Sequence, residues 1–422
     1  MRLMVVLLIY LSFLFGCKDS YEPIKPIEPT NPCGDSTKEL KPVWQVSLIS
    51  DSTRCVGSAI FSLNDKVATM VADQKNQRIM AYKVQVPTLV WQWIRTSDIR
   101  ALYGKDLDNY QYKDRLLLCD SYSIPVLNTD NGNLITRPTI PTTKNGNGTP
   151  RISLINGKVY QGMADSNQFV GSNCFLLRLD LNSSKWDTVL EFKRKDHFGY
   201  MGGIEPPALH INNAKDSILM FKFRTIAPTG APVSRLFFYA YNLTQKRVEW
   251  RKDSLDYDGS IYPPIIEGNR VYVDGLFSVY CLDANTGNII WSKYVASRFQ
   301  GSTGLFLYKD KIAGITLDGS FVCLDKETGN VVYQYKDDSR GQYDLASPSP
   351  AVQYNGVLYV MAGSYFYGLD IETGAILGKY KSPNRCKYRS ALFGYSGIAV
   401  NAQAGLVFVD DEYFLMAIKA FK

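Results

Sequence analysis

The sequence predicts an all-β fold, an eight-bladed β-propeller of four-stranded antiparallel blades whose ring is closed by an N-terminal strand. Three observations predict it. The motif Asp-x-x-Thr-Gly recurs at intervals of 42 and 45 residues, and a period of about 40 to 45 residues is typical of propeller blades. Short apolar runs separated by Gly, Asn and Asp fill each repeat, as expected of strands and hairpins. Incomplete repeats at the two ends of the chain complement each other.

The repeat at residues 261–294 shows the order of strands most clearly. An apolar, Pro-containing start (IYPPIIEG) leads to a Gly-Asn turn, and the runs RVYVDG, SVYCLD and NIIWSKY follow, the last two separated by a short turn. Four such strands form one small sheet that cannot bury its faces alone. Each repeat therefore needs neighbours on both sides.

The Asp-x-x-Thr-Gly corner is predicted to be a turn device. Glycine suits the positive φ of a short hairpin loop, and Asp and Thr oxygens can accept hydrogen bonds from local backbone amides. We therefore interpret these carboxylates as structural and not catalytic. The three copies comprise Asp283, Thr286 and Gly287, then Asp325, Thr328 and Gly329, and finally Asp370, Thr373 and Gly374.

Weaker copies of the corner extend the series to eight repeats. The last repeat stops at Lys422, directly after its third strand. Its outer strand is predicted to come from residues 42–49 (PVWQVSLI), where Trp44 takes the place of Trp250 and Trp291 in complete repeats. Such closure removes a free sheet edge. The predicted propeller domain is therefore 42–422.

These repeats resemble the pyrroloquinoline-quinone-like (PQQ-like) propeller repeat, whose consensus runs roughly Val-Tyr-Val, Gly, Leu-x-Ala-Leu-Asp, x-x-Thr-Gly, Trp. The segments VYCLDANTGNIIW, FVCLDKETGNVVY and FYGLDIETGAIL carry the resemblance, which covers about residues 261–381 and is degenerate elsewhere. Eight-bladed members of that family include quinone-dependent alcohol dehydrogenases and a non-enzymatic lipoprotein of the outer-membrane β-barrel assembly machinery. Because one fold serves both classes, the site residues must distinguish them.

For the dehydrogenases, the resemblance implies a vicinal Cys-Cys disulfide over the quinone, a stacking Trp and a calcium set of Glu, Asn and Asp. No adjacent Cys-Cys pair occurs in this sequence. Only His197 and His210 are present, without HExxH, CxxC or Gly-x-Ser-x-Gly motifs. The acidic segments 106–109 and 256–259 lack the further ligands of a calcium loop. We therefore predict no catalytic residue, no metal site and no bound PQQ.

The N-terminal segment resembles a bacterial lipoprotein signal. Arg2 precedes an apolar run at residues 3–15, too short and wrongly flanked for a spanning helix, and the run leads into Leu-Phe-Gly-Cys. The resemblance implies removal of residues 1–16, acylation of Cys17 and a lipid anchor in the outer membrane. An ordinary signal peptide with a chance cysteine is the alternative. Cys-Lys-Asp-Ser at 17–20 partly resembles the surface-export signal of Bacteroidetes lipoproteins, which favours the cell surface over the periplasmic face.

Residues 17–41 are predicted to be an extended tether, because they contain four prolines and no apolar period. Seven cysteines remain besides the lipidated one. Cys281 and Cys323 hold the same strand position in neighbouring repeats and are expected to point into the cores between blades. The favoured disulfide joins Cys33 to Cys55, in an oxidising compartment.

The connections between repeats are the predicted binding surface. They are long and rich in Arg and aromatic residues, whereas the hairpins within the best repeats are minimal. Long loops gathered on one face are where propellers usually bind partners. We call this predicted surface the funnel; its candidate residues are Arg100, Tyr103, Tyr200, Tyr262, Arg298, Arg340, Tyr343, Arg385 and Arg389.

Segment 223–235 (FRTIAPTGAPVSR) lengthens a hairpin of the fourth repeat. Because it lies between strands of one blade, we expect it to project separately from the funnel, either to grip a partner or as a tolerated insertion.

The sequence favours a binding protein. The net charge of +7 is scattered and includes no basic run, so nucleic-acid binding is not indicated. The leading hypothesis is a non-enzymatic, lipid-anchored scaffold that binds a protein partner in an outer-membrane or cell-surface complex. The alternative is a surface lipoprotein whose tyrosine-lined funnel binds a glycan or small ligand. A quinoprotein dehydrogenase is the third hypothesis.

Overall fold

The chain divides into two compact units, Met1–Ser36 and Thr37–Lys422. All the residues that the structure describes belong to the second unit. The computed structural model describes residues 40–48, 59–72, 77–95, 110–119, 123–141, 147–164, 173–193, 201–226, 235–257, 259–260, 262–295, 299, 304–316, 318–335, 349, 351–362, 365–384, 393 and 397–422.

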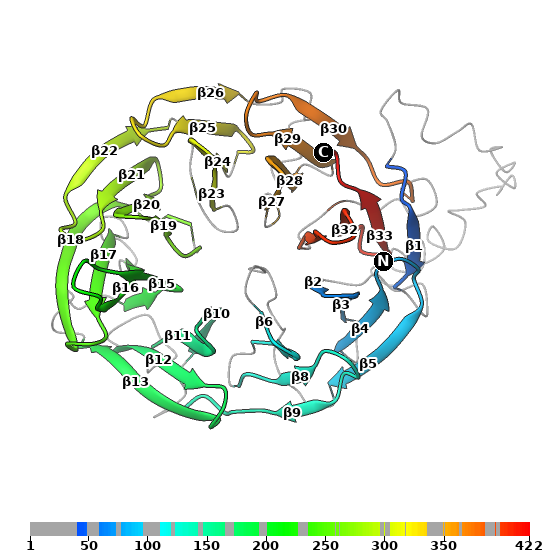
Figure 1. Cartoon of the computed structure of the whole chain (residues 1–422), viewed down its shortest axis with the longest axis horizontal. Helices are drawn as coiled ribbons and strands as arrows, with labels where there is room; N and C mark the ends of the chain where they lie inside the picture. The colour runs from blue at the N-terminus through cyan, green and yellow to red at the C-terminus, as the bar shows by residue number, and fades with distance from the viewer. Residues whose placement is uncertain are drawn as a thin grey trace, which may run out of the picture. The chain divides into compact units, whose positions relative to one another are not determined.

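The described residues form eight antiparallel sheets arranged as a ring (Figure 1). This confirms the predicted all-β, eight-bladed propeller. None of these residues forms a helix long and apolar enough to cross a bilayer.

The blades follow one another in chain order, and the strands of a blade succeed one another from the inner edge to the outer edge, except that β1 forms the outer edge of blade 8. Blade 1 contains β2 (Ile60–Leu63), β3 (Lys66–Ala72), β4 (Gln77–Lys83) and β5 (Leu89–Arg95), and blade 2 contains β6 (Gln111–Tyr112), β7 (Arg115–Leu117), β8 (Val126–Asn128) and β9 (Leu134–Thr136). Blade 3 contains β10 (Asn147–Ile155), β11 (Lys158–Ala164), β12 (Cys174–Asp180) and β13 (Lys185–Phe192). Blade 4 contains β14 (Met201–Ile204), β15 (Ala208–Ile211), β16 (Ser217–Ile226), β17 (Arg235–Asn242) and β18 (Arg247–Tyr257). Blade 5 contains β19 (Ile265–Glu267), β20 (Arg270–Asp274), β21 (Ser278–Asp283) and β22 (Ile289–Tyr294), and blade 6 contains β23 (Leu305–Tyr308), β24 (Lys311–Ile315), β25 (Phe321–Asp325) and β26 (Val331–Tyr335). Blade 7 contains β27 (Val352–Tyr354), β28 (Val357–Ala362), β29 (Tyr365–Asp370) and β30 (Ile376–Tyr380). Blade 8 contains β31 (Ala399–Asn401), β32 (Leu406–Asp410), β33 (Phe414–Lys419) and β1 (Trp44–Ser47).

The hydrophobic cores lie between neighbouring blades. Alternate side chains of a strand point to opposite faces of its sheet. On β20, Val271 and Val273 therefore pack in a core with blade 4 residues such as Phe238, whereas Tyr272 packs in a core with blade 6 residues such as Ile312. Each sheet is buried on both faces, which is why a single repeat could not fold alone.

The ring is closed as predicted, by pairing of the two ends of the propeller domain. β1 lies antiparallel to β33, with Trp44 opposite Ala417, and completes the sheet of blade 8. The strand begins at Trp44 and not at Pro42, because proline has no backbone N–H to add to the ladder. Val43 N still donates a 2.7 Å hydrogen bond to Ala417 O.

Outer-strand aromatic residues join several blades to the next one. Trp291 Nε1 donates a 3.0 Å hydrogen bond to Lys326 O in the following blade, and its ring lies against Gly329. Trp250 contacts Ala284 O and Gly287 in the same way. The glycine of the corner therefore serves two purposes: it adopts a φ of +71° at Gly329, and it leaves room for the ring of the preceding blade.

The Asp and Thr of the corner make local hydrogen bonds. Asp325 Oδ1 accepts hydrogen bonds from Thr328 N at 2.8 Å and from Thr328 Oγ1 at 2.7 Å. These bonds hold the pKa of Asp325 below its usual value. Asp283 makes the same contacts with Thr286, and Asp370 Oδ1 accepts from Thr373 N.

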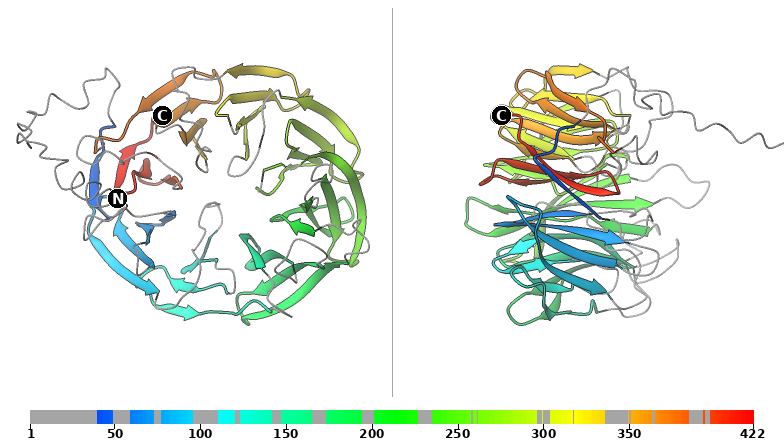
Figure 2. Two further views of the ribbon diagram at one scale, coloured as in Figure 1. Left: turned by 180° about the vertical axis from the view of Figure 1, so that it is seen from behind. Right: turned by 90° about the vertical axis from the view of Figure 1, so that its right-hand side faces the viewer.

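The strand directions define two faces of the propeller (Figure 2). Connections from the first strand to the second, and from the third to the fourth, lie on one face, which we call the turn face. Connections from the second strand to the third, and the crossovers from one blade to the next, lie on the other, which we call the loop face. Antiparallel pairing requires this alternation.

The expectation for segment 223–235 was wrong in one respect. Residues 227–234 lie outside the described part, but β16 ends at Ile226 and β17 begins at Arg235, opposite Tyr257 at the end of β18. Both attachment points of the segment therefore lie on the loop face, together with the crossovers, and not apart from them.

Several other predictions fall outside the described residues. These are the signal peptide 1–16, most of the tether 17–41, the lipidation site Cys17, and the favoured pair Cys33 and Cys55. Cys281 and Cys323 are described, and both are free thiols buried between blades.

Candidate binding site on the loop face

Tyr262 is the candidate funnel residue that the structure describes. The other eight, Arg100, Tyr103, Tyr200, Arg298, Arg340, Tyr343, Arg385 and Arg389, lie outside the described residues. All eight belong to crossovers, because each falls between the outer strand of one blade and the first strand of the next. The described strand ends and turns therefore show where on the propeller the crossovers with these residues are attached.

Tyr262 links three blades at the loop face. It lies in the crossover from blade 4 to blade 5, and its ring packs on Gly304 at the entrance to blade 6, where a β-carbon would come within 2.8 Å of the ring. Its backbone N lies 3.4 Å from Ser260 Oγ and donates to it. Since the ring is half-buried, Tyr262 has a structural role besides any role in binding.

A buried ion pair fixes this crossover from below. Lys222 Nζ on β16 lies 3.1 Å from Asp274 Oδ1 at the end of β20, and the two side chains are 0% and 5% exposed. Both partners also contact Ser260 in the crossover: Lys222 Nζ donates to Ser260 Oγ at 3.2 Å, and Ser260 N donates to Asp274 Oδ2 at 2.5 Å. Charges removed from water are tolerated only when such partners satisfy them. The cluster therefore ties blade 4, the crossover and blade 5 together.

The crossover from blade 7 to blade 8 is fixed by similar chemistry. Asp411 Oδ2 accepts hydrogen bonds from Ser382 Oγ at 2.5 Å and from Asn384 Nδ2 at 2.8 Å. Asp411 Oδ1 accepts from Tyr413 N and Phe414 N. All three polar side chains are buried. Arg385 follows Asn384 directly in the sequence. This candidate is therefore next to a residue that a buried hydrogen bond to Asp411 holds in place.

A third crossover, from blade 6 to blade 7, ends at a serine that bonds to the backbone. Ser349 N donates to Met361 O at 2.8 Å, and Met361 N donates to Ser349 Oγ at 2.9 Å. Ser349 is buried. In three of the crossovers, residues that the structure describes thus fix the chain by buried polar contacts.

Blade 4 rises above its neighbours on the loop face. β16 and β18 are 10 and 11 residues long, whereas β20 and β22 have 5 and 6. The inner edge is split into β14 and β15, which both pair with β16. The break coincides with Pro206 and Pro207, which cannot donate to a ladder. On this extension, Glu205 Oε1 lies 3.4 Å from Arg224 Nη2.

The sequence analysis missed the ion pair and the aspartate of blade 8. One signal was available for Lys222, which interrupts the apolar run ILMFKF; a lysine inside a buried strand requires a partner. Its partner Asp274 is 52 residues away, and nothing in the repeat pattern identifies it.

The turn face carries a small polar pocket of about 250 Å³. Asn212, Glu249 and Asn285 line it together with Trp250. The Trp250 ring packs against Gly287 and against Phe238, whose ring centroid is 5.8 Å away. These contacts leave Trp250 poorly placed to stack on a sugar ring. His210, 3.5 Å from Asn285, also lies on this side, away from the crossovers.

Metal ligands do not cluster in the described part of the chain: no group of three or more His, Cys, Asp or Glu side chains there is arranged to hold an ion. The buried charges described at the loop face are instead satisfied by an opposite charge, as in Lys222–Asp274, or by neutral hydrogen-bond donors, as in Asp411. Within these residues, the polar chemistry of the loop face serves to fix loops.

The comparisons with known proteins agree with this fold. The PQQ_2 family model, described as outer membrane protein assembly factor BamB, matches residues 229–416. No curated protein matches the chain.

Solved structures with the same fold belong to different functional classes. BamB from Moraxella catarrhalis is 14% identical over 90% of this chain and 97% of its own, with a TM-score of 0.56. Quinohemoprotein alcohol dehydrogenase from Comamonas testosteroni is 8% identical over 90% of this chain and 76% of its own, with a TM-score of 0.61. A europium-containing methanol dehydrogenase is 12% identical over 87% of this chain and 84% of its own, with a TM-score of 0.58. At such identities the likeness concerns the fold, which is compatible with either class.

Proposed function

We propose that this protein is a non-enzymatic, lipid-anchored scaffold that binds a protein partner of an outer-membrane or cell-surface complex through its loop face. The observation that carries the proposal is the fixing of crossovers by buried polar contacts, such as Ser260 on the Lys222–Asp274 pair and Asn384 on Asp411. The family model that matches residues 229–416 is described as an outer-membrane assembly factor, which supports the same class of function.

Fixed crossovers suit protein binding for a physical reason. Association costs free energy when loops and side chains must become ordered at the interface, and loops held in place beforehand reduce that cost. Arg and Tyr dominate the binding energy of many protein interfaces. The crossovers supply both residue types from several blades, so that a partner would contact a broad, rigidly based surface.

The proposed location follows from the sequence. Acylation of Cys17 would hold the propeller to the outer membrane through the tether, and the Lys and Asp that follow Cys17 favour the cell surface. A lipid anchor would keep the propeller close to membrane-embedded partners.

The test is a pull-down of the lipidated protein from mildly solubilised membranes. The test variant changes four crossover arginines to Ala: Arg298, Arg340, Arg385 and Arg389. The matched control variant changes four cationic residues in strands away from the crossovers to Ala: Lys83, Lys185, Arg247 and Arg251. A stoichiometric membrane protein that copurifies with the wild type and the control, but not with the test variant, is the expected result.

Other results would overturn the proposal. A partner retained by the test variant would exclude the loop face as the binding surface. A ligand-dependent rise in melting temperature with a glycan, and no protein partner, would favour the surface glycan-binding alternative. Quinone absorbance or dye-linked dehydrogenase activity would identify an enzyme.

A further inference from the structure

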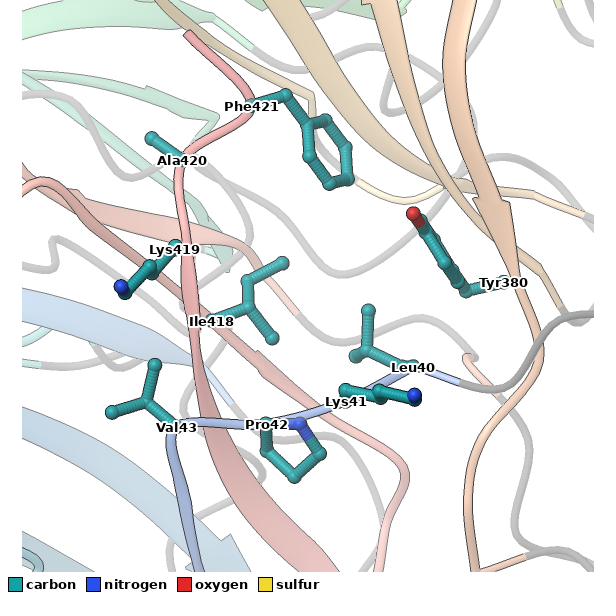
Figure 3. A pocket seen from close by; sticks show the side chains of 9 residues that line it. All are labelled: Leu40, Lys41, Pro42, Val43, Tyr380, Ile418, Lys419, Ala420 and Phe421. Atoms are coloured by element: carbon teal, nitrogen blue, oxygen red, sulfur yellow. The ribbon is translucent and has the colours of Figure 1, made fainter.

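The seam between blades 7 and 8 contains a groove of about 930 Å³ (Figure 3). Its apolar wall includes Leu40, Ile418 and Phe421, with Tyr380 opposite them. Lys41 and Lys419 border it, and both are exposed.

The groove exists because blade 8 is assembled from two distant parts of the chain. In the other blades a tight hairpin joins the third strand to the fourth, as the Ala-Asn-Thr-Gly turn joins β21 to β22. In blade 8 the third strand is β33 and the fourth is β1, so that no hairpin covers this corner. The space is left between the end of β33 and the chain that enters β1.

We propose that this groove is a docking surface for an anionic membrane, against which the edge of the propeller rests. The described lining contains two lysines and no carboxylate. An apolar surface bordered by lysines matches the chemistry of lipid, since acyl chains fit the apolar part and acidic headgroups pair with the ammonium groups. Lysine stems can lie along the apolar surface while their charges reach the headgroups.

Val43, which lines the groove, is 51% exposed. An apolar side chain with this exposure enlarges the apolar surface that lipid can contact.

The membrane is the favoured occupant because of where the chain leaves the propeller. The described part begins at Leu40, in the wall of the groove. Only residues 18–39 separate it from Cys17, the predicted lipid attachment site, and these 22 residues can span at most about 75 Å. Stable anchoring commonly combines an acyl chain with a second, basic contact. The groove would supply that contact next to Leu40, where the predicted tether joins the propeller domain.

The experiment uses a form without lipid, residues 17–422 with Cys17→Ser, so that any vesicle binding belongs to the polypeptide. Flotation is measured with vesicles of phosphatidylcholine alone and of phosphatidylcholine mixed with phosphatidylglycerol. The test variant is Lys41→Glu with Lys419→Glu. The control is Lys185→Glu with Lys293→Glu, on the outer strands of blades 3 and 5. Each lysine near an anionic surface contributes a factor of about 5 to partitioning, so loss of the two lysines alone weakens binding roughly 30-fold. We expect at least this loss in the test variant, because each glutamate also adds a repelled negative charge.

A second variant separates the apolar contribution from the charge. Val43→Ser keeps both lysines, adds no charge and, because Val43 is half exposed, should leave the melting temperature nearly unchanged while weakening flotation. The proposal is overturned if the form without lipid ignores anionic vesicles, binds neutral vesicles equally well, or loses as much binding in the control as in the test variant. The four crossover arginines should have no effect, which distinguishes this surface from the proposed protein-binding face.

Discussion

The ring of Phe421 lies on the backbone of Gly368, so close that a β-carbon on this glycine would come within 2.1 Å of the ring. The same ring packs on Gly378, the residue opposite Gly368 in the sheet of blade 7. Gly378 holds the register position that Trp291 holds opposite Cys281 in blade 5. Phe421 therefore supplies, from the other side of the seam, the aromatic contact that blade 7 lacks.

Two further contacts fix this tail. Phe421 N donates to Tyr359 Oη at 2.9 Å, and Lys422 Nζ forms an ion pair with Asp370, the corner aspartate of blade 7. We call residues 420–422 the latch. The ring is closed by β1 on β33, and the latch additionally holds the end of blade 8 against blade 7.

The first prediction concerns the latch. Phe421→Ala removes a half-buried aromatic ring and exposes two glycines, and we expect a loss of about 2 kcal/mol in the free energy of unfolding. Urea denaturation followed by tryptophan fluorescence measures it. Tyr294→Ala is the control, because Tyr294 is 67% exposed; its midpoint should remain near that of the wild type. Equal midpoints for Phe421→Ala and wild type would show that the latch does not stabilise the ring.

The second prediction concerns closure of the ring by β1. Deletion of residues 18–35 should leave the melting temperature almost unchanged, since they belong to the predicted tether and precede the propeller domain. Deletion through Ile49 should lower it markedly, because this removes β1, the Trp44 indole hydrogen bond to Val84 O and the only cover on the outer edge of β33 in the described part. Similar melting temperatures for the two truncations would contradict closure by β1.

The repeated features of the fold were predictable from the sequence because they recur. The corner at Asp325, Thr328 and Gly329 signals its hairpin by composition, and Trp44 revealed the missing strand of blade 8 by matching Trp291 in a neighbouring repeat. Local physical rules suffice for such features, since turn chemistry and strand alternation depend on adjacent residues.

The features that occur once were not predictable. Phe421 lies beyond the last strand and matches no repeat position. Its packing on blade 7 could have been expected only from the glycine at position 378, where other repeats have an aromatic ring. Lys222 and Asp274 belong to different blades, and their meeting depends on how two sheets pack. The crossovers that carry most funnel candidates have no common pattern, and only Tyr262 lies in the described residues.

The third prediction separates backbone strain from ring contact at the corner glycine Gly329, with Gly405, in the turn between β31 and β32, for comparison. Gly329 and Gly405 both have a positive φ, but a β-carbon on Gly329 would meet the Trp291 ring at 2.6 Å, whereas nothing lies within 4 Å of one on Gly405. Both Ala substitutions should incur about 1 kcal/mol of strain. Gly329→Ala should lose at least about 1 kcal/mol more, because the ring must move.

Comparison of the two urea midpoints measures this difference. A shift in Trp291 fluorescence should accompany Gly329→Ala and not Gly405→Ala. If both variants lose the same stability, the contact between Trp291 and Gly329 does not contribute, and the glycine is required for φ alone.

The fourth prediction concerns the Lys222–Asp274 pair. Lys222→Met leaves a carboxylate buried without its cation and should lower the free energy of unfolding by about 3 to 5 kcal/mol. Asp274→Asn alone should also destabilise, because it leaves the ammonium group unpaired. The double variant should recover part of the loss, since no unpaired charge remains.

A double-mutant cycle in urea measures this coupling. Strictly additive effects would show that the two charges do not interact as the 3.1 Å distance indicates. In the membrane pull-down, the stable double variant should still bind the partner less well than wild type if the pair holds the crossover of Tyr262 in place.

The fifth prediction concerns alkaline pH. Burial raises the pKa of the Cys281 and Cys323 thiols from 9.0 to about 11, and burial likewise raises the pKa of Tyr272 to about 12. A group whose pKa is higher in the folded state binds its proton more tightly there than in the unfolded chain. Its contribution to stability is therefore fully present below the unfolded value and disappears as the pH rises through the folded value.

Stability should consequently fall between pH 9 and pH 11, where the unfolded thiols have ionised and the folded ones have not. Urea midpoints across this window measure the fall. In the Cys281→Ala, Cys323→Ala double variant the slope should be smaller between pH 9 and pH 11 and should steepen only above pH 10, where tyrosines ionise in the unfolded chain. An unchanged slope in the double variant would mean that the two thiols are not held neutral by burial between the blades.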